Sequence, residues 1–249
     1  HLDIPYTGSD PATLALALDT QLAKTVVRDA GVRTAPSFVL ENGDEPVPQG
    51  MRFPLVVKPV AEGSSKGVHE GGVVHDVESL RRVARALITR YRQPALAEAY
   101  LSGREFTVAV LGWPQPTVLT PMEIAFTDKA GAFPIYSFRH KQSFTPEVEY
   151  RTDGSHLTPE LRREIEQVVL RSWNALGCRD VARFDVRLDA EGRVNFIECN
   201  PLPGLTPDWS DLCLICNAAG VSYPSLIERI LQPALQRLDQ RRAAARAVD

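Results

Sequence analysis

The pattern of apolar and polar positions predicts several helices and several short strands along the chain. Between residues 10 and 31, apolar residues recur at helical spacing on a face formed by Leu14, Leu18, Leu22 and Val26. Gly31 supplies a stop, so this stretch is expected to form one amphipathic helix.

Three further segments have the periodicity or the end signals of helices. Residues 75–91 can begin at Asp76 as the N-cap, and their inward positions are Leu80, Val83, Ala84 and Leu87. Residues 157–177 have a capping residue, Thr158, just before the first turn. Residues 223–249 are expected to form a last helix that runs into a basic, alanine-rich tail.

Short apolar runs between these helices predict strands. They lie in residues 53–60, in residues 94–112, where Ser102–Gly103 separates two strands, and in residues 115–126. Residues 127–154 are polar, irregular and contain aromatic residues, so they are expected to form a long loop, and long loops often act as lids over functional sites. Because strands and helices do not alternate regularly, the predicted fold class is α+β or mixed α/β.

The stretch "ARFDVRLDAEGRVNFIECNPLPG", residues 182–204, predicts a β-hairpin with an unusual polar face. Counting back from a turn at residues 190–193 gives the opposed pairs Asp189–Val194, Asp185–Glu198 and Arg183–Asn200. Side chains alternate along a strand, so the last two pairs share one face of the sheet. Directly opposed carboxylates lie only about 5 Å apart and repel each other, so we expect a cation between them.

The residue types on this face indicate which cation. Carboxylate and amide oxygens, with no histidine or cysteine among them, suit a hard ion such as Mg²⁺. Asp185, Glu198 and Asn200 are therefore predicted to bind magnesium, with Mn²⁺ as the alternative ion. The other interpretation is a solvated sheet face with Arg183 and Arg187 as ion-pair partners, but it does not explain why the strand ends abruptly in "NPLPG".

A second segment is suited to binding phosphate. In "VVKPVAEGSSKGV", residues 56–68, Lys58 ends a buried strand and a glycine- and serine-rich loop follows at once. Small residues let backbone N–H groups approach phosphate oxygens, and the lysine adds a point charge. The segment has neither the Walker motif nor the G-x-G-x-x-G fingerprint, and most such loops are only connections. Beside a magnesium site, however, it is a candidate phosphate lid.

Composition excludes some classes of protein without selecting a function. The chain has 249 residues, of which 44% are hydrophobic and 24% charged, and its net charge of −3 lacks the basic excess of a general nucleic-acid binder. No apolar run approaches the ~20 residues of a membrane helix, and the first residues lack the features of a signal peptide, so a cytoplasmic location is expected. The four cysteines, including Cys213 and Cys216, are expected to be buried thiols.

Three segments, taken in order, resemble the ATP-grasp superfamily and more closely the D-alanine–D-alanine ligases. They are "VVKPVAEGSSKGV", "LAEAYLSGREFTVAVLG" and "GCRDVARFDVRLDAEGRVNFIECNPLPGLTP". The resemblance covers nearly the whole chain and implies an α+β, ATP-grasp fold, with ATP held between the antiparallel sheets of two subdomains. It implies that residues 1–10 are a remnant of an N-terminal domain or linker, residues 11–97 the central subdomain and residues 98–249 the C-terminal subdomain.

The same resemblance implies a reaction. ATP phosphorylates one carboxylate, and an amine then attacks the acyl phosphate to give an amide, ADP and phosphate. The substrates would be small amino acids, in the cytoplasmic step of peptidoglycan biosynthesis that these ligases perform. Neither nucleic acid nor a membrane would take part, and a homodimer is the assembly to consider.

The resemblance also assigns nucleotide-binding roles. Lys58 matches the lysine on the nucleotide phosphates, and the Gly/Ser loop contributes Glu62, Gly63, Ser64 and Ser65, with Ser64 near the reacting carboxylate. The hinge around adenine consists of Glu98, Tyr100 and Leu101, and the acceptor of the ribose hydroxyls is Glu105. Lys141 matches the lid lysine that reaches the terminal phosphate.

The remaining roles concern the metal and the reacting groups. Asp185, Glu198 and Asn200 match the ligands of two magnesium ions, with Glu198 bridging. Arg183 matches the arginine on the transferred phosphoryl group and the oxyanion, where the backbone N–H of Gly204 also helps. The second substrate's carboxylate is held at the position of Ser210, Asp211 and Leu212, in a segment one residue longer than the usual pattern.

Departures from the family pattern keep alternatives open. Thr20 stands where a lysine is common, and Lys24, one turn later, matches a second family lysine that would compensate in part. Gln142 replaces a frequent tyrosine after the lid lysine, and the family domain that holds the first amino acid would precede this chain. The leading hypothesis is an ATP-dependent carboxylate–amine ligase that joins two amino acids. The alternatives are a nucleotide-binding module without ligase activity and a ligase for a different amino acid or hydroxy acid pair.

Overall fold

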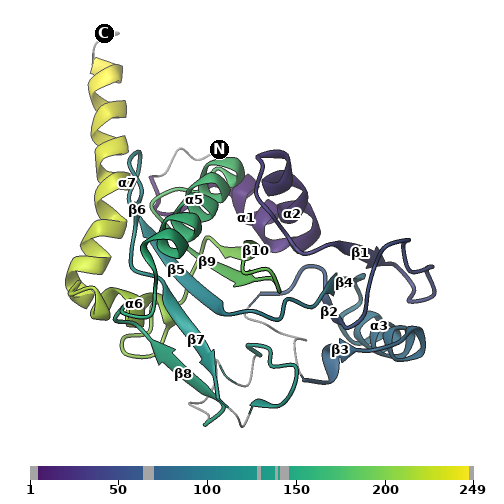
Figure 1. Cartoon of the computed structure of the whole chain (residues 1–249). Helices are drawn as coiled ribbons and strands as arrows, with labels where there is room; N and C mark the ends of the chain where they lie inside the picture. Colours follow the sequence, from purple (N-terminus) through teal and green to yellow (C-terminus); the bar gives the residue numbers. More distant parts are fainter. Residues whose placement is uncertain (1–4, 64–69, 128–129, 138–139, 141–145, 247–249) are drawn as a thin grey trace.

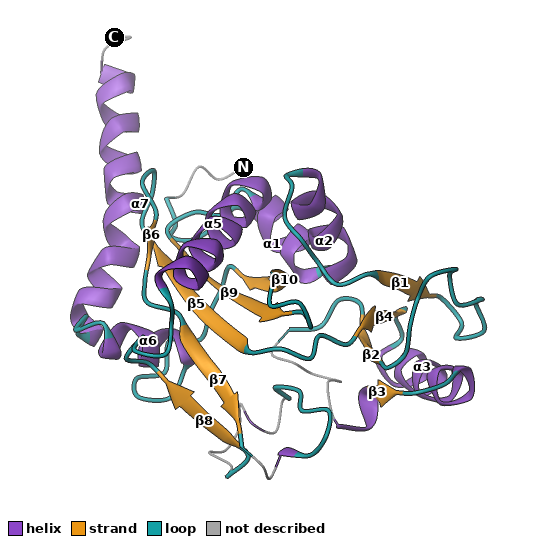
Figure 2. Cartoon of the chain, in the orientation of Figure 1, coloured by secondary structure: helices purple, strands orange, loops and turns teal. Residues whose placement is uncertain are grey.

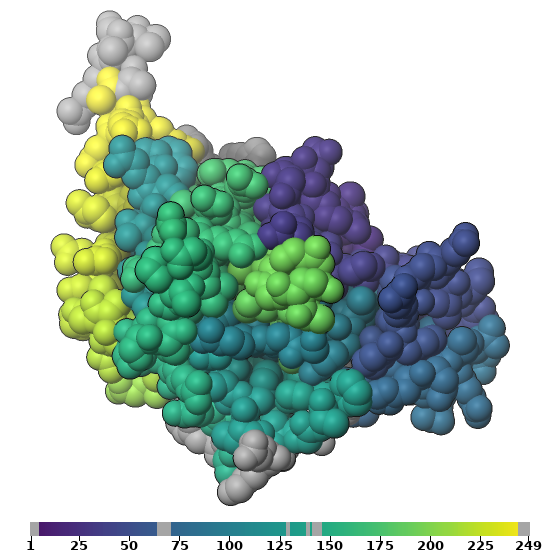
Figure 3. All heavy atoms as spheres, viewed as in Figure 1, coloured from purple at the N-terminus to yellow at the C-terminus, as the bar shows by residue number. Residues whose placement is uncertain are grey.

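Two antiparallel sheets lie side by side in the computed structural model, and helices pack against both of them (Figures 1 and 2). The structure describes residues 5–63, 70–127, 130–137, 140 and 146–246. The smaller sheet forms a lobe, blue in Figure 3, beside the larger body of the molecule. Two antiparallel sheets with helices make the fold α+β, as the sequence predicts.

The small sheet has four strands in the order β1-β4-β2-β3. Their bounds are β1 Ser37–Leu40, β2 Leu55–Pro59, β3 Val73–Val74 and β4 Ala95–Ala99. A short 3-10 turn, η1 Glu70–Gly72, precedes β3, and the helix α3 Val77–Tyr91 packs on the sheet. Leu80, Ala84 and Leu87 of α3 are buried in its core, and Asp76 caps the helix as predicted.

The large sheet has the strand order β10-β9-β5-β7-β8, with β6 paired to β5. Its strands are β5 Glu105–Leu111, β6 Thr117–Val118, β7 Met122–Phe126, β8 Val148–Arg151, β9 Val181–Leu188 and β10 Val194–Asn200. Helices cover both of its faces. One face carries α1 Pro11–Leu18, α2 Thr20–Asp29 and α5 Pro159–Leu176, and the other carries α6 Asp211–Ala218 and α7 Tyr223–Arg246.

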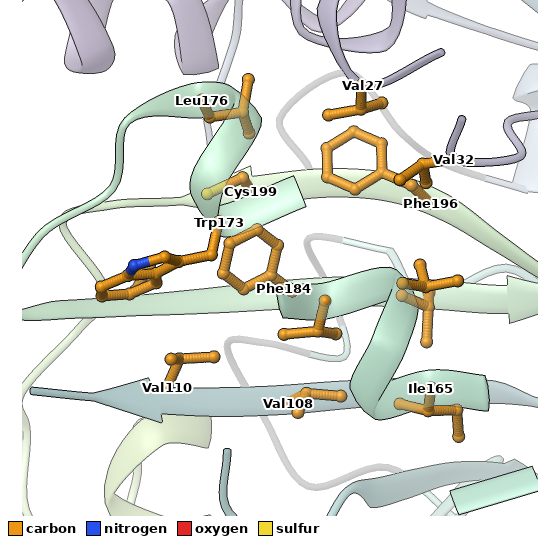
Figure 4. Close-up of a cluster of buried hydrophobic side chains, with 14 of the residues drawn as sticks. Val27, Val32, Val108, Val110, Ile165, Trp173, Leu176, Phe184, Phe196 and Cys199 are labelled. Carbon is orange, nitrogen blue, oxygen red and sulfur yellow. The ribbon is translucent and has the colours of Figure 1, made fainter. Parts of the chain in front are cut away.

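Alternation along the central strands separates the core from the site. Phe184 and Phe196 point to the face under α5, where they pack with Trp173, Ile165 and Val27 (Figure 4). The opposite face of β5 and β9 is apolar only at one end, where α6 and α7 cover Ala109, Leu111 and Val181. The other end of that face carries the polar side chains of the predicted site.

The predicted hairpin is present, but its register contains a β-bulge. Val194 pairs with Leu188 rather than with Asp189, so the predicted pairing next to the turn is wrong. An extra residue, Ile197, then shifts the register by one, so Asp185 does oppose Glu198 and Arg183 does oppose Asn200. A bulge re-aims the side chains that follow it, and here it turns Glu198 away from the core face that holds Phe196.

The predicted helix over residues 10–31 is wrong in its continuity and in its buried face. It consists of two helices, because the side chain of Asp19 caps α2 by accepting a hydrogen bond from the Leu22 backbone. The break rotates the second helix, so Leu18 and Leu22 are 52% and 54% exposed. Ala23, Lys24 and Val27 are buried in their place, together with Ala17 of α1.

Other elements agree with the prediction in part. α5 begins after Thr158 and ends at Gly177, whose left-handed backbone forms the C-cap. The predicted strand over residues 115–126 is divided into β6 and β7, and the predicted loop over residues 127–154 contains β8, which pairs with β7. The sequence pattern did not identify β1, β3 or α6.

Two general expectations can be compared with the structure. All four cysteines are buried and free, as predicted, although the sulfur atoms of Cys178 and Cys199 lie 3.6 Å apart. Within the described residues, no helix is both long enough and apolar enough to cross a membrane. The division of the chain at residues 97 and 98 stays a proposal. Of the helices that it assigns to the central subdomain, α1 and α2 pack mainly on the large sheet, and α2 also contacts β1 of the small sheet.

Candidate active site

A cleft between the two sheets is lined by five of the seven predicted nucleotide-binding residues that the structure describes. Its lining comprises Val56, Lys58, Glu98, Ala99, Tyr100, Leu101, Glu105, Ile135, Tyr136, Asp185, Arg187, Ile197 and Glu198. Most of these residues come from β2 and β4 of the small sheet and from β5, β9 and β10 of the large one. The segment after β4 contributes Tyr100 and Leu101, and the segment between β7 and β8 contributes Ile135 and Tyr136. The fold therefore brings together positions that are more than a hundred residues apart in the sequence.

Glu98 lies between two buried lysines at one side of the cleft. Its Oε1 is 2.8 Å from the Nζ of Lys58, and its Oε2 pairs with the Nζ of Lys24. Burial alone would raise the pKa of Glu98, but the charges of Lys24 and Lys58 outweigh it and lower that pKa to about 2. The Glu98 side chain is thus bound to two cations.

Lys24, the residue expected to compensate in part for Thr20, binds Glu98. Lys24 is fully buried on α2, and burial lowers its pKa while the charge of Glu98 opposes that shift. Lys24 and Lys58 bind the two oxygens of the same carboxylate, that of Glu98. The pKa of Lys58 is raised because neighbouring acids, Glu98 first, outweigh the effect of burial. Lys58 is therefore a permanent positive charge in the cleft.

Arg183 supplies a positive charge between the predicted metal ligands. Its Nε and Nη2 donate to the two oxygens of Asp185, each at 3.0 Å, and Nη2 lies 3.8 Å from Oε1 of Glu198. Burial would lower the pKa of Arg183, but Asp185 and other nearby acids raise it. Thr107 also donates to Asp185 at 2.7 Å. The opposed carboxylates are thus held together in this chain by its own guanidinium group.

The donor set fits a hard divalent cation as well. Asn200 lies beside Glu198, with its Nδ2 donating to Oε1 at 3.1 Å, so two carboxylates and one amide oxygen share this region. Among the described residues, no group of three or more histidine, cysteine, aspartate or glutamate side chains is arranged to hold a metal. Mg²⁺ commonly uses only one or two carboxylates and completes its shell with phosphate oxygens and water, so this set suits it.

Glu105 and Tyr100 meet around Arg187, a residue that the sequence assignment of site residues missed. Arg187 donates to Oε2 of Glu105 at 3.1 Å and to the hydroxyl of Tyr100 at 3.0 Å. A signal was available in the sequence, because Arg183, Asp185 and Arg187 alternate along one strand and must share a face.

A second cavity begins where the Gly/Ser loop leaves β2. It is lined by Leu14, Ala17, Leu18, Thr20, Glu62, Gly63, Glu198, Cys199, Asn200, Pro201 and Leu202. The start of the predicted phosphate lid therefore faces the end of β10, and Glu198 lines both cavities. Glu62 also accepts a hydrogen bond from Gln93 at 3.1 Å. Ser64, Ser65, Lys141 and Gln142 lie outside the described residues.

The predicted second-substrate segment has one accessible and two buried members. Leu212 is fully buried in the core beneath α6, so only its backbone could meet a substrate. Asp211 lies 3.3 Å from Nη1 of Arg183 and accepts a hydrogen bond from Tyr136 at 3.2 Å. Ser210 accepts one from the Thr206 backbone. A Cβ at Gly204 would lie only 2.7 Å from the Ser210 hydroxyl, so a larger residue there would displace the Ser210 side chain.

Known proteins are similar to this chain in sequence. A family model described as "D-ala D-ala ligase C-terminus" matches residues 26–232. D-alanine–D-alanine ligase B of Brucella melitensis is 33% identical over 238 residues, which cover 94% of this chain and 72% of that protein.

Two solved structures have the same fold. The D-alanine–D-alanine ligase from Coxiella burnetii superposes with a TM-score of 0.77 at 23% identity, over 99% of this chain and 64% of that one. The Bacillus anthracis enzyme complexed with ATP gives a TM-score of 0.76 at 24% identity, over 96% of this chain and 73% of that one. The chain therefore spans roughly two thirds of the length of these relatives.

These matches confirm the family, the ATP-grasp fold and the class of enzyme expected from the sequence motifs. Members of the family are ATP-dependent ligases that form a peptide bond. Because the family model matches most of this chain and a curated relative is 33% identical to it, the chain belongs to the D-alanine–D-alanine ligase family.

Proposed function

We propose that this chain forms the ATP-binding and phosphoryl-transfer part of a ligase that joins two amino acids through an acyl phosphate. One observation carries the proposal. Lys58 from the small sheet and the polar face of β9 and β10 from the large sheet line the same cleft. A cation on one wall and a carboxylate pair on the other are what a nucleotide triphosphate and its metal require.

The cleft suggests an orientation for the nucleotide. The hinge segment from Glu98 to Leu101 would face the adenine with its backbone, and Glu105 would accept hydrogen bonds from the ribose. Lys58 and the loop containing Glu62, Gly63, Ser64 and Ser65 would meet the phosphates. The proposal is supported by the fact that Lys58, the hinge residues and Glu105 line one cleft.

Asp185, Glu198 and Asn200 would hold magnesium. When bound, the metal would neutralise charge on the phosphates and orient them for transfer. Arg183 would stabilise the negative charge that develops on a transferred phosphoryl group, and its contacts with Asp185 and Glu198, two of the proposed metal ligands, support this role. The backbone N–H of Gly204 would assist at the oxyanion formed when the amine attacks.

Lys141 and the segment around it would close over the reacting groups. An acyl phosphate hydrolyses readily, so water must be excluded while the amine attacks. Ser64 would lie near the reacting carboxylate, and the second substrate would lie near Ser210, Asp211 and the backbone of Leu212. The identity of the two amino acids is not assigned, because Gln142 departs from the pattern of many relatives.

A second function is favoured by one observation, namely that Thr20 and not a lysine lines the second cavity. With Lys24 bound to Glu98, the phosphate region has one fewer direct cation than the family pattern supplies. A nucleotide-binding module without ligase activity is therefore the alternative. The Arg183–Asp185–Glu198 arrangement argues against it, because binding alone does not need an arginine at the transferred phosphate.

Phosphate release by the complete gene product separates the two functions. The assay contains ATP, Mg²⁺ and a panel of L- and D-amino acids and hydroxy acids, with mass spectrometry of the products. Release that depends on two substrates, with an amide or ester product, supports the ligase. Tight ATP binding without any condensed product would support the binding module instead. Sedimentation of the same sample would test the proposed homodimer.

A further inference from the structure

Arg187 lines the proposed nucleotide cleft and makes four hydrogen bonds. Its Nε donates to the Gly103 carbonyl at 3.2 Å, and Nη1 donates to Oε2 of Glu105 at 3.1 Å. Its Nη2 donates to the Tyr100 hydroxyl and to the Pro134 carbonyl, both at 3.0 Å. The residue is only 6% exposed, so its charge is almost completely removed from water.

Aromatic rings fix the guanidinium as well. Its central carbon lies 4.9 Å from the ring centre of Tyr100 and 5.5 Å from that of Phe126. Buried charges are unfavourable unless paired, and here Glu105 supplies the opposite charge from the facing position on β5. Arg187 and Glu105 are therefore a preorganised pair whose orientation is set before any ligand enters the cleft.

The hydrogen bonds also leave capacity for a ligand. A guanidinium has five N–H donors, and the described partners use one at Nε, two at Nη2 and one of the two at Nη1. The remaining donor is on Nη1, the nitrogen that already contacts Glu105. A ligand hydroxyl close to Glu105 could thus donate a hydrogen bond to the carboxylate and accept one from the guanidinium.

We propose that Arg187 positions Glu105 for the ribose hydroxyls and itself donates a hydrogen bond to one of them. The inference rests on the proposed function, since it requires a nucleoside triphosphate in the cleft. Hydrogen bonds to charged groups are the stronger ones, so losing both ribose hydroxyls should weaken nucleotide binding roughly 10- to 100-fold. The Arg187–Glu105 pair would then distinguish nucleotides by their sugar and not by their base.

Tyr100 offers a matched control because it shares one contact with Arg187. The carbonyl of Pro134 accepts hydrogen bonds from the Tyr100 hydroxyl at 3.1 Å and from Arg187. Arg187 therefore anchors the segment around Pro134 as well as Glu105. Tyr100→Phe removes the shared hydroxyl but leaves the Arg187–Glu105 pair, so it separates anchoring of the loop from recognition of the sugar.

The decisive measurement is calorimetric binding of ATP and of 2′,3′-dideoxy-ATP to the complete protein, each with Mg²⁺. Wild type should prefer ATP by roughly 10- to 100-fold. Arg187→Met should reduce that ratio to near one, and Tyr100→Phe should retain it. Arg187→Lys keeps the charge without the planar fork, so it should also reduce the ratio, and it serves as the test if the methionine variant does not fold.

Three outcomes bear on the two proposals differently. If wild type binds neither nucleotide, the proposed function fails. If wild type binds both equally, or if the Arg187 variants keep the wild-type ratio, the ribose-recognition proposal is overturned while the proposed function stands. If Tyr100→Phe lowers the ratio as much as Arg187→Met does, the effect belongs to anchoring of the loop, and the assignment to Arg187 and Glu105 is wrong.

Discussion

The ammonium group of Lys24 on α2 binds the carboxylate of Glu98 on β4. Because α2 packs on the large sheet and β4 belongs to the small one, this buried ion pair joins the two halves of the cleft. Glu98 also holds Lys58, the proposed phosphate ligand. A single contact therefore supports both the geometry of the cleft and the position of its main cation.

Replacing Lys24 with methionine should destabilise the protein by roughly 3 kcal/mol, at the low end for breaking a buried ion pair because Lys58 still pairs with Glu98. Urea unfolding of wild type and variant would measure this change. The control is Arg163→Met on the exposed face of α5, where the ion pair with Glu160 should contribute less than about 1 kcal/mol. Equal losses in both variants would contradict the structural role of Lys24.

Stability should also depend on pH through Glu98. Its pKa is lowered to about 2 in the folded protein from an ordinary value of 4.5. A lowered pKa stabilises the fold above the ordinary value, and the stabilisation is lost as the pH falls from 4.5 towards 2. Between about pH 5 and pH 3, wild type should therefore lose unfolding free energy more steeply than Glu98→Gln. Parallel losses in urea titrations at several pH values would refute this expectation.

Substitutions at two proposed magnesium ligands, Asp185 and Glu198, should differ in their effect on the free energy of unfolding, although both should reduce activity. Asp185→Asn weakens the bonds from Arg183 and Thr107, so it should cost roughly 1.5–3 kcal/mol. Glu198 is less buried and lies farther from Arg183, so Glu198→Gln should cost less than about 1 kcal/mol.

Both variants should lower Mg²⁺-dependent ATP turnover by more than about 100-fold. Measuring turnover beside thermal unfolding separates the two effects. Wild-type turnover in the well-folded Glu198→Gln variant would show that this carboxylate holds no metal.

Deleting Ile197 tests the β-bulge. Without the extra residue, Glu198 directly follows Phe196, and regular pairing keeps it opposite Asp185 on the face of the site. We therefore expect the deletion variant to fold, as checked by circular dichroism. Its Mg²⁺-dependent ATP turnover should fall by up to about 100-fold, because Ile197 lines the cleft and the bulge sets the aim of the side chains that follow it. Ile197→Val keeps the bulge and should change stability by no more than about 1.5 kcal/mol. Wild-type turnover in a folded deletion variant would mean that the bulge is dispensable.

Local signals in the sequence were sufficient for features that depend on neighbouring residues. Asp76, Thr158 and Gly177 mark helix ends because capping involves groups only a few residues apart. Alternation along β9 placed Arg183 and Asp185 on one face for the same reason. The motifs around Lys58 and the hairpin likewise identified the family, since each is a contiguous stretch.

Contacts between distant segments were decided by the tertiary structure. The cap at Asp19 could have been read locally, but the burial of Lys24 in place of Leu22 follows from its pairing with Glu98, 74 residues away. The register of β10 depends on a bulge that no spacing rule predicts, because its position is set by which side chains must enter the core. Arg187 acquires its partners only when β5, β9 and the segment around Pro134 converge. Residue patterns thus determined which groups share an element and a face, whereas packing between the elements determined which of those groups meet in the cleft.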